Sequence, residues 1–382
     1  MLAILGTYFL VVELLKSQIT KTQNQNGKKN FIGYWKLDIG NSRSIALLGA
    51  LLLAISPWHI YLSRLGHEVG LGLTLFIWGT YIFIRALRDG HKVNLLFVSA
   101  MIFVLSLYAY QSEKIVTPLI VTVLAFLYRD KLAKYPKKVL LSGLLGTVLI
   151  LPLLWATLTS PGLIRLQATN AFTPDNPRYI QHAQKYNEAK ANKDIPGLVV
   201  YNRRLVPFFI FSSQYLAHFS PQWLFTGGPR ESHKVPGLGL LYLWEAPFIL
   251  LGIVILLRAK IQKRIKLLII FWLLIAPLPG AVTTQAPHAM RSYTFLPMWQ
   301  VLGALGLAAF AQTMSIQRKK AVLALIFAGI LFAGSSLKFY TQYFFVFPAT
   351  QSDSFQYALA RSLTSKELLQ KDYDRIIVSN KD

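Results

Sequence analysis

Isolated basic residues stand between apolar stretches of the chain, where they could hold an anion. Arg64, Lys114 and Arg291 each lie in a short polar turn that contains little other positive charge. Arginine offers a planar fork of donors and lysine a point charge, and both suit the oxygens of a phosphate group. Glu68 follows Arg64 by one helical turn, and His288 shares a turn with Arg291. We therefore expect these turns to form one polar surface that binds an anion.

A second candidate region lies in the long segment that precedes residue 239. Gly227 and Gly228 come just before a turn that contains Arg230, Glu231 and His233. Glycine permits backbone conformations that bring the chain close to a ligand, which Arg230 and His233 could then contact. A turn rich in glycine and proline is also typical of a plain connector, and on this signal alone the connector is favoured.

Aromatic residues and histidines accompany the same turns. The aromatic ones are Trp58, Tyr61, Tyr108 and Tyr110. Such residues are enriched at the depth of the lipid headgroups, and we interpret them as interfacial anchors. His59 and His218 fit either an interfacial position or contact with a ligand.

The composition indicates which elements hold these turns. Of the 382 residues, 54% are hydrophobic and 15% are charged, whereas about a quarter of a soluble domain is charged. The net charge of +24 comes from basic residues that lie between apolar blocks. This pattern favours loops that flank membrane spans over a nucleic-acid-binding surface. The chain has no cysteine, which excludes disulfides, thiolate metal sites and cysteine nucleophiles.

The apolar blocks approach the length that crosses a bilayer, about 20 residues per helix, and indicate about ten spans. We place them at residues 1–15, 44–62, 70–87, 94–110, 115–128, 139–158, 239–257, 267–278, 295–311 and 321–337. Basic residues are concentrated in alternate short loops, which places those loops in the cytoplasm. The segments 159–238 and 339–382 then lie outside.

The predicted fold class is an all-α membrane protein, a polytopic helical bundle. Residues 1–338 form the transmembrane domain, with 159–238 as a large extracytoplasmic loop. Residues 339–382 form an extracytoplasmic segment, in which 375–379 read as a strand that opens an α/β element.

Both ends of the sequence read as incomplete. The first apolar block would reach only about 22 Å, against about 30 Å for the hydrocarbon core. Its basic cluster follows the block, which is the reverse of a signal peptide. At the other end, the α/β element stops as soon as it begins. We therefore expect a further helix and outer loop upstream, and a longer C-terminal segment.

Four ordered runs of the sequence carry a resemblance to a known family. They are SPWHIYLSRLGHE at 56–68, LSLYAYQSEKIVTP at 105–118, YLAHFSPQWLFTGGPRESHKVPGLGLLYLWEAP at 215–247 and PHAMRSYTFLP at 287–297. Together they resemble bacterial membrane glycosyltransferases of the dolichyl-phosphate-mannose-protein mannosyltransferase type. That group has a multi-helix fold and uses lipid-phosphate-linked sugars. The likeness covers nearly the whole chain, and no single run fixes the sugar or the acceptor.

The resemblance implies a polyprenyl-phosphate sugar donor and transfer on the outer face of the cell membrane. It implies that the carrier phosphate is surrounded by Arg64, Lys114, Arg230, His233, His288 and Arg291. It also makes Glu68 and Glu231 the candidate acids. A carboxylate would deprotonate the acceptor hydroxyl, and cations would stabilise the departing phosphate. The acceptor stays open between a lipid, a glycan and a protein, and nucleic acid is not expected.

Two further points follow from the resemblance and the residue spacing. The main catalytic acid of the family lies in the first outer loop, which would precede residue 1 here. We therefore expect an active membrane glycosyltransferase only where that loop is restored, and otherwise an inactive fragment or a non-catalytic scaffold. No cofactor is certain: the spacing of histidines and acids provides no metal-ligand set, although a divalent metal stays open.

A transporter or flippase of a lipid-linked or anionic solute is the alternative from another class. Such proteins usually contain internal repeats and broken helices at the membrane midplane. The sequence has no convincing repeat, and its charged residues cluster near the outer surface instead.

Overall fold

The computed structural model describes residues 1–22, 42–88, 92–159, 170–173, 176–228, 231, 234–259, 261–316, 318–351 and 361. Within these ranges the chain is helical and has no β-strand, and one isolated bridge joins Asn170 to Thr283. The predicted all-α fold class is confirmed for this part of the chain. The strand predicted at 375–379 lies outside the described residues.

Four helical segments among the described residues are long and apolar enough to cross a membrane. They are α4 (Val69–Arg88), α8 (Pro136–Leu158), Lys263–Ala281 with α14 (Lys263–Ile275) and α15 (Leu278–Ala281), and Tyr293–Thr313 with η5 (Tyr293–Phe295) and most of α16 (Leu296–Ile316). Helix α8 leaves Leu140, Leu144 and Trp155 exposed along its length. A helix with so much exposed apolar surface needs a lipid environment, and these segments mark the chain as a membrane protein.

The span predicted at 44–62 is divided by a sharp bend. Helix α2 (Ser42–Ile55) and helix α3 (Pro57–Arg64) meet at an angle of 57°. Pro57 cannot donate a backbone hydrogen bond into α2, so it begins a new helix instead of continuing the old one. Leu240 stabilises the bend, because its carbonyl accepts hydrogen bonds from the Trp58 backbone and from the Ser56 hydroxyl. The pair counts as a fifth span if it is treated as one broken helix.

The remaining predicted spans correspond to other helices. They are α1 (Leu2–Thr22), α5 (Leu95–Ala109), α6 (Glu113–Leu127), α13 (Ala246–Arg258) and α17 (Arg318–Thr341); the short α7 (Arg129–Leu132) follows α6. Of these helices, α5, α6 and α13 have only 13 to 15 residues. The helix expected from residue 239 begins later, after the 3-10 turn η4 (Leu243–Glu245), with Pro247 in its first turn.

Two helices, α4 and α16, form the centre of the bundle. Helix α4 packs against α1 and α5, and α16 packs against α13 and α2. Helices α13 and α16 approach each other closely at two glycines. A Cβ atom on Gly252 would lie 1.9 Å from the Leu302 carbonyl oxygen, and one on Gly306 would lie 1.8 Å from the Phe248 carbonyl oxygen. Small residues allow this contact between membrane helices.

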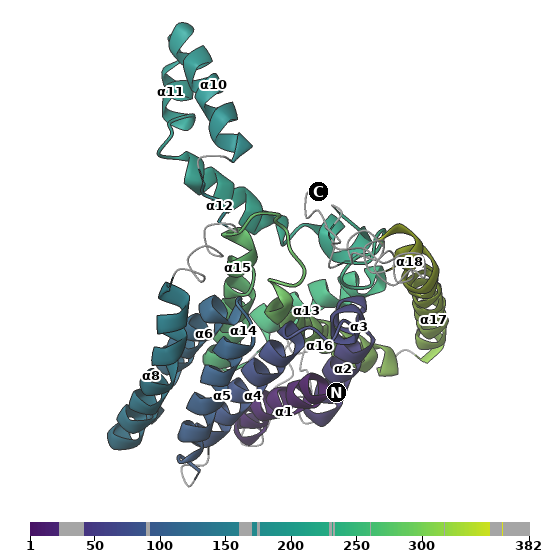
Figure 1. Cartoon of the computed structure of the whole chain (residues 1–382). Coiled ribbons are helices and arrows are strands. Elements are labelled where there is room, and N and C mark those ends of the chain that lie inside the picture. The colour runs from purple at the N-terminus through teal and green to yellow at the C-terminus, as the bar shows by residue number, and fades with distance from the viewer. Residues whose placement is uncertain are drawn as a thin grey trace, which may run out of the picture.

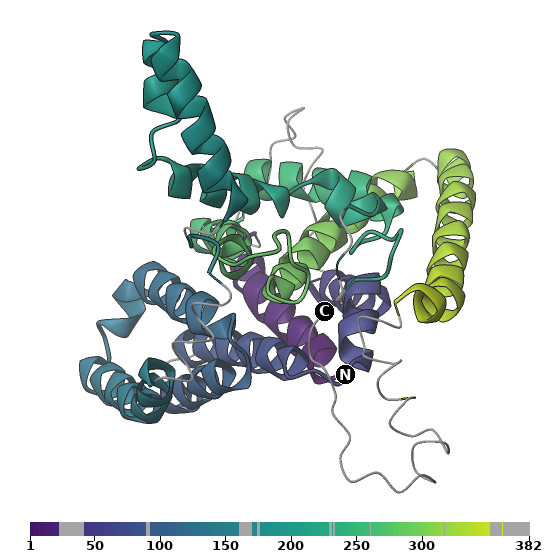
Figure 2. The same ribbon diagram turned by 45° about the horizontal axis from the view of Figure 1, so that its top comes forward.

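A helical arm projects from one end of the bundle. It consists of α10 (Pro177–Ala191) and α11 (Ile195–Val200), and α12 (Val206–Ala217) connects it to the rest (Figure 1). The arm also points away from the other helices after the molecule is turned (Figure 2). After α17, the π-helical turn η6 (Gln342–Val346) and α18 (Phe347–Thr350) lie beside α3 at that end.

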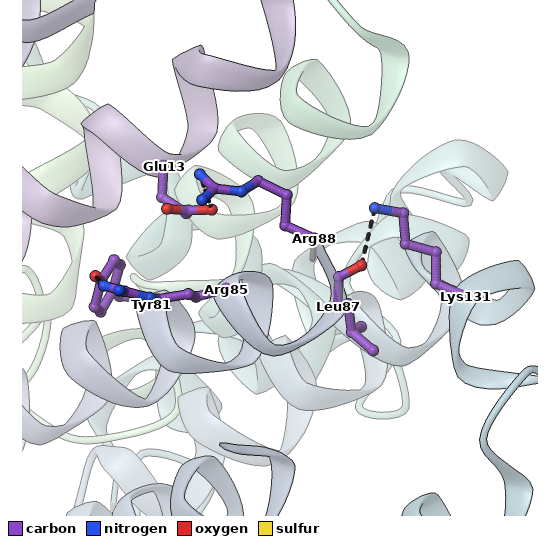
Figure 3. A network of polar contacts seen from close by, with 6 residues as sticks. All are labelled: Glu13, Tyr81, Arg85, Leu87, Arg88 and Lys131. Carbon is purple, nitrogen blue, oxygen red and sulfur yellow. Dashed lines mark hydrogen bonds and ion pairs between the residues drawn. The ribbon is translucent and has the colours of Figure 1, made fainter. Parts of the chain in front are cut away.

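Basic residues of alternate loops meet at the opposite end of the bundle. Arg88 at the end of α4 forms an ion pair of 2.7 Å with the buried Glu13 of α1 (Figure 3). Lys131 donates a hydrogen bond of 3.1 Å to the Leu87 carbonyl (Figure 3). Arg264 pairs with Asp130 at 2.8 Å, and this pairing lowers the pKa of the aspartate. These contacts join α1, α4, α7 and α14 at this end of the bundle, whereas the candidate site lies at the other end.

Candidate functional site

The segment 286–291, which leads from α15 to η5 and α16, is the centre of the candidate site. Its residues 287–290 are buried. The peptide bond between Ala286 and Pro287 is cis. The Ala289 carbonyl accepts a hydrogen bond of 3.0 Å from the Trp58 indole of α3. The segment is thus bound to α3, the second half of the broken helix, which is distant from it in the sequence.

Glu231 is the acidic residue that this segment binds. One carboxylate oxygen accepts a hydrogen bond of 2.7 Å from the Ala289 backbone amide. The other accepts a hydrogen bond of 2.6 Å from the Trp223 indole, in the π-helical turn η3 (Gln222–Thr226). Burial raises the pKa of Glu231, and the two hydrogen bonds oppose that shift. The carboxylate is therefore held in one orientation between two elements.

Lys234 lies close to this acid and was not predicted from the sequence. Its side chain is only 5% exposed. The ammonium donates a long hydrogen bond of 3.4 Å to the Trp223 carbonyl and lies 5.9 Å from the centre of the Trp223 ring. Burial lowers the pKa of Lys234 to about 8, and the charge of Glu231 acts in the opposite direction.

A pocket of about 310 Å³ opens beside Glu231 and Lys234. Its wall is formed on one side by the described residues of the loop 227–237 and on the other by residues of η6, α18 and Gln351. The lining residues are Gly227, Gly228, Glu231, Lys234, Val235, Pro236, Gly237, Val346, Thr350 and Gln351. The pocket thus combines a carboxylate, a cation and two exposed glycines, Gly228 and Gly237.

Two buried histidines lie beside this part of the chain, His218 against the segment 286–291 and His59 against Tyr293 of η5. His218 is fully buried; its Nε2 accepts a hydrogen bond of 3.3 Å from the His288 amide, and its Nδ1 lies 2.8 Å from the Gln214 carbonyl. This pattern fits a neutral ring, and burial lowers the pKa of His218 to about 4. His59 lies 2.5 Å from the Tyr293 hydroxyl through its Nδ1. The hydrogen bonds of these two rings are within the fold, which favours a structural role for both.

Arg291 lies at the other end of the segment and is only partly exposed. Its guanidinium donates hydrogen bonds of 2.7 Å to the Thr283 hydroxyl and 2.8 Å to the Thr284 carbonyl. Burial lowers the pKa of Arg291, and the nearby Tyr110 hydroxyl opposes that shift. The Arg291 backbone amide also donates to the ring of His288 at 3.4 Å. His288 and Arg291 therefore lie in the same turn, and their binding of a phosphate stays a prediction.

The other predicted residues make their contacts elsewhere at this end. Arg64 is exposed and lies over the rings of Tyr343 and Phe344 of η6, at 5.2 and 5.4 Å. Lys114 donates a hydrogen bond of 3.3 Å to the Thr157 hydroxyl of α8. Glu68 is exposed and lies 3.2 Å from its neighbour His67.

The part of the chain that the structure describes gives no position for Arg230 and His233. It also contains no group of three or more histidine, aspartate and glutamate side chains that could hold a metal ion. Glu113, at the start of α6, is a buried carboxylate in the same polar turn as Lys114; it accepts a hydrogen bond of 3.0 Å from Thr117. No role in the site was predicted for it from the sequence.

Comparison with known proteins leaves the geometry as the basis for assigning a function. No family model matches the chain, and no curated protein or solved structure was found to match it.

Proposed function

We propose that this chain transfers a sugar from a polyprenyl-phosphate donor to an acceptor hydroxyl, at the extracytoplasmic surface of the cell membrane. The observation that carries the proposal is the hydrogen bond between Glu231 and Ala289. It fixes a partly buried carboxylate against the short segment that ends in Arg291. One segment therefore holds a base and a cation, which are the two groups that this reaction requires.

The chemistry assigns each group a role. Glu231 accepts the proton of the acceptor hydroxyl, and the acceptor oxygen forms a bond to the anomeric carbon of the sugar. The bond between that carbon and the phosphate oxygen breaks, and its electron pair stays on the polyprenyl phosphate. Arg291 stabilises the charge that develops there. Because burial raises the pKa of Glu231, its carboxylate is a stronger base than an exposed one.

Further residues extend this assignment. His288 lies in the same segment as Arg291 and would contact the carrier phosphate with it. Lys114, Arg64, Arg230 and His233 belong to the proposed phosphate-binding set on the resemblance of the sequence alone. The exposed position of Glu68 suits an accessory acid at the rim more than a base in the site.

The proposed membrane arrangement has about ten spans, since α1, α5, α6, α13 and α17 would cross together with the four longer segments and the broken helix α2–α3. The separation of the basic end from the candidate site supports it. Cytoplasmic loops carry the excess of lysine and arginine, which would place the basic end inside and the site outside.

The test is a transfer assay with the full chain in proteoliposomes. Polyprenyl-phosphate hexose and pentose donors are supplied with lipid, glycan and peptide acceptors, and release of polyprenyl phosphate is measured. Glu231→Gln is expected to lower the rate about 10² to 10⁴-fold, the usual contribution of a general base. Arg291→Gln is expected to lower it to a similar degree.

Two exposed residues of the arm provide matched controls. Glu188→Gln and Arg203→Gln make the same chemical changes away from the segment 286–291 and are expected to leave the rate unchanged. Full activity in Glu231→Gln and Arg291→Gln would contradict the proposal. Movement of the donor lipid across the bilayer without sugar transfer would contradict it as well, and would indicate a flippase.

A further inference from the structure

We infer that the pocket between the loop 227–237 and residues 346–351 binds an oxyanion, a carboxylate or a phosphate group carried by the acceptor. The assignment to an acceptor rests on the proposed function, whereas binding of the oxyanion does not. The pocket volume of about 310 Å³ lies at the lower end of the range of small-molecule sites. It can therefore hold one compact group.

Lys234 is the residue that selects the ligand. An ammonium group has three donors, and burying it is costly unless they are paired. Lys234 is 5% exposed and has one long hydrogen bond of 3.4 Å, to the Trp223 carbonyl. Among the described residues, no carboxylate lies within 4.0 Å of its nitrogen. The cation thus has donor capacity at the wall of a pocket, where an anion would pair with it.

Glu231 does not neutralise this lysine in the way that a direct ion pair would. Both of its carboxylate oxygens already accept hydrogen bonds, from Trp223 and from Ala289. These bonds hold the carboxylate toward the segment 286–291 and leave Lys234 free to bind a ligand from the pocket side. A ligand oxygen next to Lys234 would also lie close to the proposed base.

The glycines of the loop make the wall accessible to a ligand. Gly227, Gly228 and Gly237 have φ angles of 154°, 88° and 69°, which side chains rarely adopt. A Cβ atom on Gly228 would lie 3.1 Å from the Trp223 Cα atom. The conformation therefore requires glycine at these positions, so three of the lining residues add no side chain to the pocket.

Lys234 and Arg291 have different neighbours. Arg291 is held by Thr283 and Thr284 and lies near Tyr110, whereas Lys234 lies against Trp223 and the pocket. The proposed function assigns the carrier phosphate to a set of residues that includes Arg291 and His288 but not Lys234. We therefore assign the anion at Lys234 to the acceptor, which is the other substrate of the reaction.

The test measures binding at Lys234 in the purified full chain, without requiring turnover. Lysine side chains are acetylated at pH 8, and mass spectrometry quantifies the modification of Lys234. The probes are inorganic phosphate, glucose 6-phosphate, glucuronate and neutral glucose. An oxyanion probe is expected to reduce modification of Lys234 at least fivefold, whereas glucose leaves it unchanged. Lys190, exposed on α10, serves as the internal control and is expected to show no protection.

Protection by phosphates alone would indicate a phosphorylated acceptor, and protection by glucuronate alone an acidic sugar or peptide carboxylate. Equal protection by glucose, or no protection by any probe, would overturn the inference. Calorimetry adds a second measurement: Lys234→Met is expected to bind the protecting anion at least tenfold more weakly than Lys190→Met. Anion binding without sugar transfer would leave this inference standing while the proposed function fails.

Discussion

At the scale of single residues, Glu231 and Lys234 form an unequal pair. The carboxylate is held by two short hydrogen bonds, whereas the ammonium has one long hydrogen bond and a face of the Trp223 ring. Hydrogen bonds to a charged group are stronger than neutral ones, so the orientation of Glu231 is well defined. The charge of Lys234 is stabilised by fewer and weaker contacts, so its protonation is sensitive to pH and to ligands.

We expect the free energy of unfolding to depend on whether Lys234 is protonated. Lys234 has a folded pKa of about 8, below its ordinary value of 10.5. Between these two values the unfolded chain binds more protons, so the free energy of unfolding rises with pH. Lys234→Met removes the buried charge and is expected to raise the midpoint of thermal unfolding at pH 7. That gain is expected to shrink as the pH approaches 10.

The comparison is made in detergent, with Lys190→Met as the exposed control. Its difference from the unmodified chain is expected to stay constant over the same pH range. A gain from Lys234→Met that is equally large at pH 7 and pH 10 would show that Lys234 does not lose its proton in this range.

The sequence predicted part of this site. The scarcity of positive charge in alternate short turns singled out Arg291, and His288 followed as its neighbour. The same reasoning could not single out Lys234, because it lies in a long segment, where charge carries little information about topology. Nor could spacing along the chain predict the contact between Glu231 and Ala289, because it depends on how two distant loops pack.

At the scale of elements, the contact between α13 and α16 positions the segment 286–291. Helix α16 begins just after that segment, and α13 follows the loop that carries Glu231 and Lys234. The two helices approach so closely that Gly252 and Gly306 lie against carbonyl oxygens of the facing helix. A change in their separation would therefore move the two halves of the candidate site apart.

We expect Gly306→Ala to destabilise the chain, by about 1–3 kcal/mol if the helices shift to accept the extra carbon. The added carbon would otherwise lie 1.8 Å from the Phe248 carbonyl oxygen. Gly329→Ala in α17 is the matched control, because a Cβ atom there would meet nothing within 4 Å. Thermal unfolding in detergent measures both, and equal midpoints would contradict the close contact.

The bend at Pro57 illustrates what hydropathy does not predict about an element. The apolar block at 44–62 is continuous, so hydropathy alone indicates one span. The proline provided a signal for an interruption. The angle also depends on the hydrogen bonds that the distant Leu240 carbonyl accepts from Ser56 and Trp58 at the bend. The late start of α13 has a similar origin, since the chain before Pro247 makes those bonds and the turn η4 instead of a helix.

At the scale of the whole molecule, the described helices have two chemically different ends. One gathers Arg88, Lys131 and Arg264, and the other carries the segment 286–291 and the arm. The lengths of the apolar blocks and the charge of the short loops predicted that successive loops lie on opposite sides of the membrane, and this stays a prediction. The projection of the arm from the bundle was not predicted, since its helices are too polar or too short to resemble spans.

The absence of cysteine from the sequence allows a direct test of this arrangement. Single-cysteine variants Gln285→Cys and Thr159→Cys are expected to react with a membrane-impermeant thiol reagent in intact cells. Lys134→Cys is expected to react only after the cells are opened, because it lies at the basic end. Labelling of all three variants from the same side would contradict the two-ended arrangement.

The ion pair between Glu13 and Arg88 constrains the order in which the chain can be built into the bilayer. Glu13 leaves the ribosome before α2, α3 and most of α4, so α1 is synthesised while its partner does not yet exist. A buried carboxylate without its cation is costly in a low-dielectric medium. We therefore expect α1 to stay beside the insertion machinery until Arg88 has been synthesised, so that α1 and α4 enter the lipid together.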